Sequence, residues 1–207
     1  MRAGRHGDQL PGGHRRLSLC GHGPAHPDPA RCGGGGSFTL ARALADRLST
    51  QVFDADDFLW QPTEPPFRKT RPPDERVAPM QAMFAPRADR VLACAICGWG
   101  DALIPRLTQV LFLTAPTEAR IIRLRRRERQ RPGAALAPGG ARAQEFRAFP
   151  DYASGYDDPA FAGRSRVQHE AWLAALACPV IRLDGSEPPG VLADRALAAL
   201  DPAAQGA

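Results

Sequence analysis

A run of four glycines stands directly before a helix-forming stretch in the segment RCGGGGSFTLARALADRL, residues 31–48. A glycine-rich loop that leads into a helix N-terminus presents backbone N–H groups and the positive end of the helix dipole to an anion. Backbone amides in such a turn can hold phosphate without a side chain. We therefore predict a phosphate loop here, with a flexible linker as the alternative. The candidate binding residues are Gly33, Gly34, Gly35, Gly36, Ser37, Phe38 and Thr39.

Carboxylates follow soon after, in the segment FDADDF. If residues 51–58 form one strand, Asp54 and Asp56 point to the same side, because side chains alternate along a strand. Paired carboxylates at the end of a strand suit Mg²⁺ held through water, or a substrate hydroxyl. The alternative is that Asp56 or Asp57 caps a helix.

Arginines are concentrated in residues 118–131, EARIIRLRRRERQR, which hold seven arginines against two glutamates. This segment alone accounts for the net charge of +5. Such a patch suits polyphosphate substrates or nucleic acid, while a solvated helix face is the plain alternative. The segment lacks interleaved aromatic residues, so we expect no nucleic-acid partner.

The five cysteines are odd in number and scattered, which argues against a disulfide framework. Cys94 and Cys97 form one CxxC pair, but no second pair completes a zinc site, so we expect structural thiols. The chain of 207 residues has no apolar run near the roughly 20 residues that span a bilayer. With no secretory signal in view, we expect a cytoplasmic protein without a membrane partner.

The elements that must position these residues alternate along the chain. Apolar runs of strand length alternate with amphipathic helices, which predicts an α/β fold, a three-layer sandwich with a mostly parallel sheet flanked by helices. The expected strands are residues 16–21, 51–58, 90–96, 109–116 and 179–185. The expected helices are residues 38–48, 74–84 (capped by Asp74), 118–131, 164–176 and 191–200, with Asp101 capping a further turn.

This order of segments resembles the P-loop nucleotide kinases, most closely small adenylate-kinase-like and shikimate- or gluconate-kinase-like proteins. The resemblance covers roughly residues 33–200 and is distinctive over FDADDFLW, CGWGDALIPR and GRSRVQHEAWL. The family's loop motif is GxxxxGK[ST]. Alignment on TLARAL places Gly36 at the second conserved glycine, Ser37 at the lysine and Phe38 at the hydroxyl residue. The phosphate loop is therefore degenerate, although Thr39 lies one residue beyond the hydroxyl position.

The resemblance implies a nucleotide-binding protein that uses ATP and Mg²⁺, with a small-molecule acceptor. It implies catalytic roles for Asp54 and Asp56 on the acceptor side, with Asp56 as a metal ligand through water. It also implies phosphate-clamping roles for Arg123 and Arg127, which share a helix face, and for Arg164. The alternative is an inactive nucleotide-binding relative, because Ser37 and Phe38 replace the defining residues.

The resemblance also suggests a division of the chain. Residues 1–32 form an atypical or poorly ordered N-terminal segment, and residues 33–200 form the kinase-like domain. Within that domain, residues 132–163 are a Gly/Pro-rich insertion that would close as a lid. Residues 201–207 form a tail.

Overall fold

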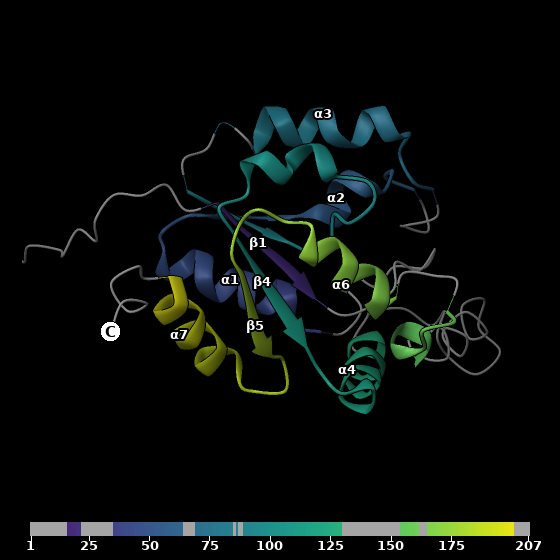
Figure 1. Ribbon diagram of the computed structural model, residues 1–207, viewed down its shortest axis with the longest axis vertical. Coiled ribbons are helices and arrows are strands. Elements are labelled where there is room, and N and C mark those ends of the chain that lie inside the picture. The colour runs from purple at the N-terminus through teal and green to yellow at the C-terminus, as the bar shows by residue number, and fades with distance from the viewer. Residues whose placement is uncertain are drawn as a thin grey trace, which may run out of the picture.

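The computed structural model describes residues 16–21, 35–63, 69–84, 86, 89–129, 154–161 and 165–200, with only the backbone described for 16–21 and 127–129. The described strands form one five-stranded sheet of order β2-β3-β1-β4-β5, in which every neighbouring pair is parallel (Figure 1). The strands are β1 Arg16–Gly21, β2 Gln51–Asp54, β3 Arg90–Ala93, β4 Gln109–Thr114 and β5 Val180–Asp184. The helices are α1 Ser37–Arg47, α2 Ala55–Leu59, α3 Pro73–Met83, η1 Asp101–Arg106, α4 Thr117–Arg129, η3 Gly155–Asp157, α6 Arg166–Ala174 and α7 Pro189–Leu200.

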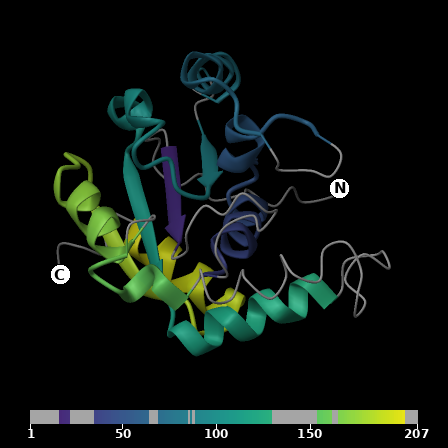
Figure 2. The same ribbon diagram turned by 90° about the vertical axis from the view of Figure 1, so that its right-hand side faces the viewer.

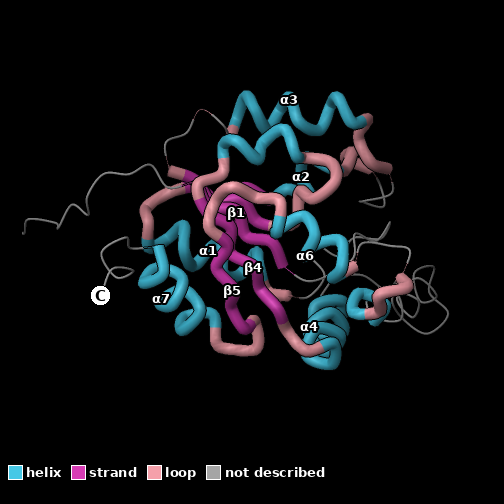
Figure 3. Tube along the Cα trace, viewed as in Figure 1, coloured by secondary structure: helices cyan, strands magenta, loops and turns pink. Residues whose placement is uncertain are grey.

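Helices cover both faces of the sheet, as the turned view and the tube view show (Figures 2 and 3). Helix α1 packs on β1, β2 and β3 and lies beside α7, while α6 packs over Phe112 on β4. Right-handed crossovers explain this division, because the chain leaves β1 toward one edge of the sheet and leaves β4 toward the other. The predicted α/β fold with a parallel sheet between helical layers is confirmed.

Strand β1 occupies the middle of the sheet, between β3 and β4. Its register places Leu19 beside Ala93 on one side and beside Leu111 on the other. The short segment RLSLCG is thus the strand that precedes the glycine loop in the chain, as its apolar pattern suggested. Because parallel strands share one carboxyl edge, the glycine loop and the ends of β2, β3, β4 and β5 all belong to that edge.

The core lies where the central strands meet the helices. All four residues of β3 are buried, and so are Val110 to Leu113 of β4. Near-continuous apolar runs of this kind are typical of a parallel sheet covered on both faces. From the helices, Leu40 and Leu44 of α1 reach the same core, as the helical spacing of the apolar residues predicted.

Several predicted boundaries are wrong by a few residues, each for a local reason. The strand expected over residues 51–58 ends at Asp54, because the Asp54 carboxylate caps α2 by accepting a hydrogen bond from the Asp56 backbone N–H. Helix α3 begins at Pro73, so Asp74 lies in its first turn and is not the N-cap. Strand β3 ends at Ala93, since the next residue, Cys94, has a left-handed backbone with φ of 72°.

Within the residues that the structure describes, no helix is both long enough and apolar enough to cross a membrane.

Candidate functional site

The start of helix α1 has no side-chain cap. Gly36 precedes the helix with a φ of 87°, a conformation that glycine adopts without strain, and no side chain caps the helix. The first turn of α1 contains no acidic residue. A helix N-terminus without a side-chain cap or a nearby acid presents the positive end of its dipole to a negatively charged group.

The three residues after the glycines have different environments. Ser37 is fully buried, and its Oγ has no hydrogen-bond partner in the described structure. A buried hydroxyl without a partner is costly, so an orphaned Ser37 at a helix N-terminus fits a site that a ligand completes. Phe38 is half-buried and packs against the core, while Thr39 is exposed. Gly33 and Gly34 lie outside the described residues.

The turn after β5 presses against the glycine loop. The Gly185 N–H donates to the Thr114 carbonyl at 2.6 Å, which ties this turn to the end of β4. A Cβ on Gly185 would lie 2.9 Å from the Gly35 carbonyl oxygen and 3.1 Å from the Thr114 carbonyl oxygen. Only glycine therefore allows the turn and the loop to approach this closely.

Arg123 reaches from α4 into the same corner. Its Nη1 donates to the Gly185 carbonyl at 2.7 Å and lies 3.9 Å from where a Cβ on Gly36 would be. Of the two other predicted arginines, Arg127 lies in α4 with its side chain outside the described residues, and Arg164 lies entirely outside them. The structure thus brings one predicted arginine to the glycine loop.

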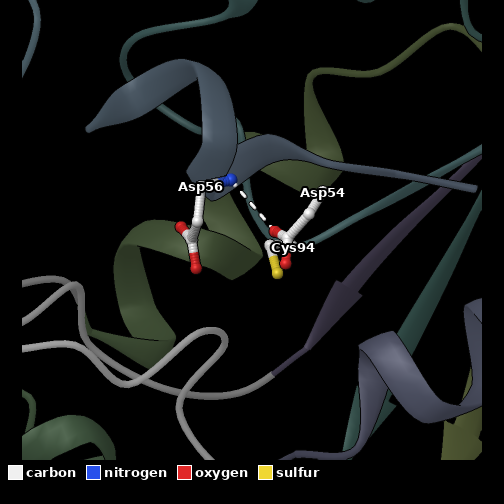
Figure 4. A group of neighbouring side chains, drawn as sticks. All are labelled: Asp54, Asp56 and Cys94. Carbon is white, nitrogen blue, oxygen red and sulfur yellow. Dashed lines mark hydrogen bonds between the residues drawn. The ribbon is translucent and has the colours of Figure 1, made fainter. Parts of the chain in front are cut away.

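Asp54, Asp56 and Cys94 form a buried cluster at the same edge of the sheet (Figure 4). One ligand atom from each lies within 4.8 Å of the others. The two carboxylates come together because Asp54 caps α2 while Asp56 sits in its first turn, with 3.0 Å between the Asp56 N and the Asp54 Oδ1. The predicted pairing of these carboxylates is present, but cap geometry produces it rather than strand alternation.

The sulfur of Cys94 does not complete a metal site. Cys94 is disulfide-bonded, contrary to the expected structural thiol, and a bonded sulfur is not a thiolate ligand. Cys97, the other member of the CxxC pair, and Cys178 are both half-buried and are not disulfide-bonded. Of the cluster, only the two carboxylates offer hard oxygen ligands, which suit Mg²⁺ when water fills the rest of its coordination shell.

Sequence reasoning missed Trp172, which joins α6 to the turn after β3. Its Nε1 donates to the Asp101 carboxylate at 2.9 Å, and the Gly98 N–H donates to the same oxygen at 3.4 Å. Gly100, not Asp101, precedes η1, so Asp101 uses its side chain to hold another element. The apolar periodicity of α6 gave no signal for this contact.

A second missed cluster anchors η3 to α4. Arg120 is fully buried and donates to the Asp157 carboxylate at 2.6 Å, and Thr117 Oγ1 donates to the same oxygen at 2.6 Å. Burial lowers the pKa of Arg120, and the Asp157 carboxylate opposes that shift. Next to this pair, the Tyr156 hydroxyl lies 2.6 Å from Nδ1 of the buried His169.

These features define an α/β protein of the doubly wound class, with a helix N-terminus and two carboxylates at the carboxyl edge of its sheet. The chain is 36% identical over 151 residues to the uncharacterized protein YqaC of Bacillus subtilis (strain 168), a match covering 73% of this chain and 83% of YqaC. The chain therefore belongs to the YqaC family. No protein-family model matches the chain.

Solved kinase structures show a weaker likeness. A gluconokinase from Sinorhizobium meliloti 1021 has a TM-score of 0.48 at 16% identity, covering 93% of this chain and 94% of the gluconokinase. A sugar kinase from Janibacter sp. HTCC2649 has a TM-score of 0.48 at 22% identity, covering 93% of this chain and 98% of the sugar kinase. A shikimate kinase from Acinetobacter baumannii has a TM-score of 0.45 at 13% identity, covering 90% of this chain and 93% of the shikimate kinase. Likenesses this low support no inference about activity.

Proposed function

We propose that the protein binds a nucleotide at the start of α1 and acts as an ATP-dependent phosphotransferase on a small hydroxylated acceptor or a nucleotide. The observation that carries the proposal is the uncapped N-terminus of α1, where the buried Ser37 Oγ has no hydrogen-bond partner in the described structure. The helix N-terminus and the Ser37 hydroxyl both favour an anion. The oxygens of a nucleotide phosphate can accept hydrogen bonds from backbone N–H groups and from a hydroxyl.

The residues around this point divide the work of phosphoryl transfer. The backbone of Gly35 and Gly36 and the Ser37 hydroxyl would hold the donor phosphates, while Arg123 lies beside them to offset their charge. Asp54 and Asp56 would hold Mg²⁺ through water, and one of them would accept the proton of the acceptor hydroxyl. Mg²⁺, when bound, would neutralise charge on the phosphates.

A second candidate is a nucleotide-binding protein without turnover. One observation favours it: Phe38 stands where the loop motif has a hydroxyl residue, and its ring packs against the core. This version predicts that ATP and ADP raise the Tm although no acceptor is phosphorylated. It also predicts that Phe38→Thr strengthens Mg²⁺-dependent ATP binding.

The first experiment measures binding and turnover together. Thermal shift and titration calorimetry with ATP, ADP and adenosine, with and without Mg²⁺, test nucleotide binding. Release of ADP is then followed over a panel of nucleoside monophosphates, sugars and polyols. Binding with turnover supports the phosphotransferase, binding without turnover supports the inactive relative, and absence of binding by the folded protein refutes both.

The acids are tested by two matched variants. Asp54→Asn and Asp56→Asn remove charge at nearly constant size, so we expect each to abolish the Mg²⁺-dependent part of ATP binding or to lower turnover by at least about 100-fold. Asp46→Asn is the control, because Asp46 is an exposed acid on α1. Equal turnover in all three variants would show that the buried pair has no catalytic part.

A further inference from the structure

We propose that Arg123 supplies to the glycine loop the positive charge that a lysine at position 37 would supply in the loop motif. The inference rests on the proposed nucleotide binding and assigns one residue a specific part in it. Ser37 stands at the lysine position, and the sole lysine of the sequence, Lys69, lies far along the chain in the exposed stretch before α3. Within the described structure, the charge must come from another element.

The geometry places Arg123 where that charge is needed. Its Nη1 lies 3.9 Å from the Cβ position of Gly36, the residue directly before α1. The hydrogen bond of 2.7 Å to the Gly185 carbonyl fixes the guanidinium against the turn that contacts Gly35. The side chain is thus positioned by a backbone group, and its charge borders the anion-binding end of the helix.

The Arg123 guanidinium has more N–H donors than its contact with Gly185 uses. Arginine has five N–H donors, and the bond to Gly185 is the one hydrogen bond that Arg123 makes among the described residues. Among the described residues the neighbouring Asp184 forms no ion pair with Arg123, although the two charges attract each other, and its Oδ1 accepts from the Ser186 N–H and hydroxyl. A guanidinium with donors left over can place its positive charge against phosphate oxygens and donate hydrogen bonds to them.

The closest rival explanation is that Arg123 only braces the Gly185 turn. Three substitutions of Arg123 distinguish a role in bracing the Gly185 turn from a role of its positive charge in phosphate binding. Arg123→Gln keeps an N–H donor for the Gly185 carbonyl but removes the charge, Arg123→Lys keeps the charge, and Arg123→Ala removes both. Arg125→Ala is the control, since Arg125 is an exposed arginine two residues along the same helix.

The probes are ATP, inorganic tripolyphosphate and adenosine, titrated into the full chain by calorimetry. We expect Arg123→Ala and Arg123→Gln to bind ATP and tripolyphosphate about 10- to 100-fold more weakly than the wild type, because a hydrogen bond to a charged group is lost. Binding of adenosine should change less than about threefold. Arg123→Lys should retain most of the affinity, and Arg125→Ala should match the wild type.

Two results overturn the inference while the proposed function stands. One is wild-type affinity for tripolyphosphate in Arg123→Gln, which would assign Arg123 a bracing role. The other is an equal loss of adenosine and ATP binding in Arg123→Ala, which would place the arginine against the base. If the wild type binds neither ATP nor tripolyphosphate, the proposed function itself fails and the inference fails with it.

Discussion

The contact between the Gly185 turn and the glycine loop gives the sharpest stability prediction. A Cβ at position 185 would lie 2.9 Å from the Gly35 oxygen and 3.1 Å from the Thr114 oxygen, and both neighbours are backbone atoms that cannot rotate away. Gly185→Ala must therefore push the turn, the loop or the end of β4 aside. Overpacking of this kind costs about 1–3 kcal/mol of unfolding free energy.

Thermal and urea denaturation would measure this cost. For a domain of this size about 1 kcal/mol corresponds to about 2–4 °C, so we expect Gly185→Ala to lower the Tm by about 2–12 °C. ATP binding should weaken as well, because the Gly35 carbonyl belongs to the proposed phosphate loop. The matched control is Gly190→Ala in the first turn of α7, where an added Cβ meets nothing within 4 Å.

The control should be as stable as the wild type or slightly more stable, since alanine favours a helix over glycine. If Gly185→Ala and Gly190→Ala show the same urea midpoint and the same ATP affinity, the turn does not pack on the glycine loop. The Gly185 turn would then not hold the proposed phosphate loop in place.

Two other perturbations test the surroundings of the site. Asp157→Asn leaves the buried Arg120 without its carboxylate. Breaking a buried ion pair costs about 3–5 kcal/mol, and Asp157 is 32% exposed, so we expect the unfolding free energy measured by urea denaturation to fall by about 2–3 kcal/mol. An unchanged urea midpoint would contradict this. Hydrogen bonds from Ser186 lower the pKa of Asp184 below its ordinary 3.8, helped by the charge of Arg123. The stability this provides is present above about pH 4 and lost as the pH falls through the lowered pKa. Ser186→Ala should therefore raise the Asp184 pKa in an NMR titration and reduce that acid-side loss, whereas an identical titration curve would argue against the contact.

Local sequence patterns were sufficient for most of the fold. The apolar run at Gln109–Thr114 predicts a buried strand, because a strand covered on both faces needs apolar residues throughout. The spacing of Leu40 and Leu44 predicts a helix, because residues four apart lie on the same buried helix face. The ends of elements were less predictable. Asp54 ends β2 because it caps a helix, and Cys94 ends β3 because its backbone is left-handed. The pattern of apolar residues predicts neither of these conformations.

The candidate site shows the same division. The types of residue at the sheet edge, glycines and acids, were readable because their chemistry is local. The place of Arg123 beside Gly185, 62 residues away in sequence, was not readable. The Trp172–Asp101 contact likewise joins residues 71 apart. Such contacts depend on the packing of whole elements, for which a single sequence contains no direct signal.

The central place of β1 has a consequence for how the chain folds during synthesis. Its partners are β3 and β4, so the strand emerges from the ribosome first but has no neighbour until residues 90–93 appear, and no second neighbour until residues 109–114. Contacts this distant in sequence make folding slow, and an apolar segment that waits unpaired is prone to aggregate. Expression of the protein should therefore benefit from a chaperone that shields nascent chains.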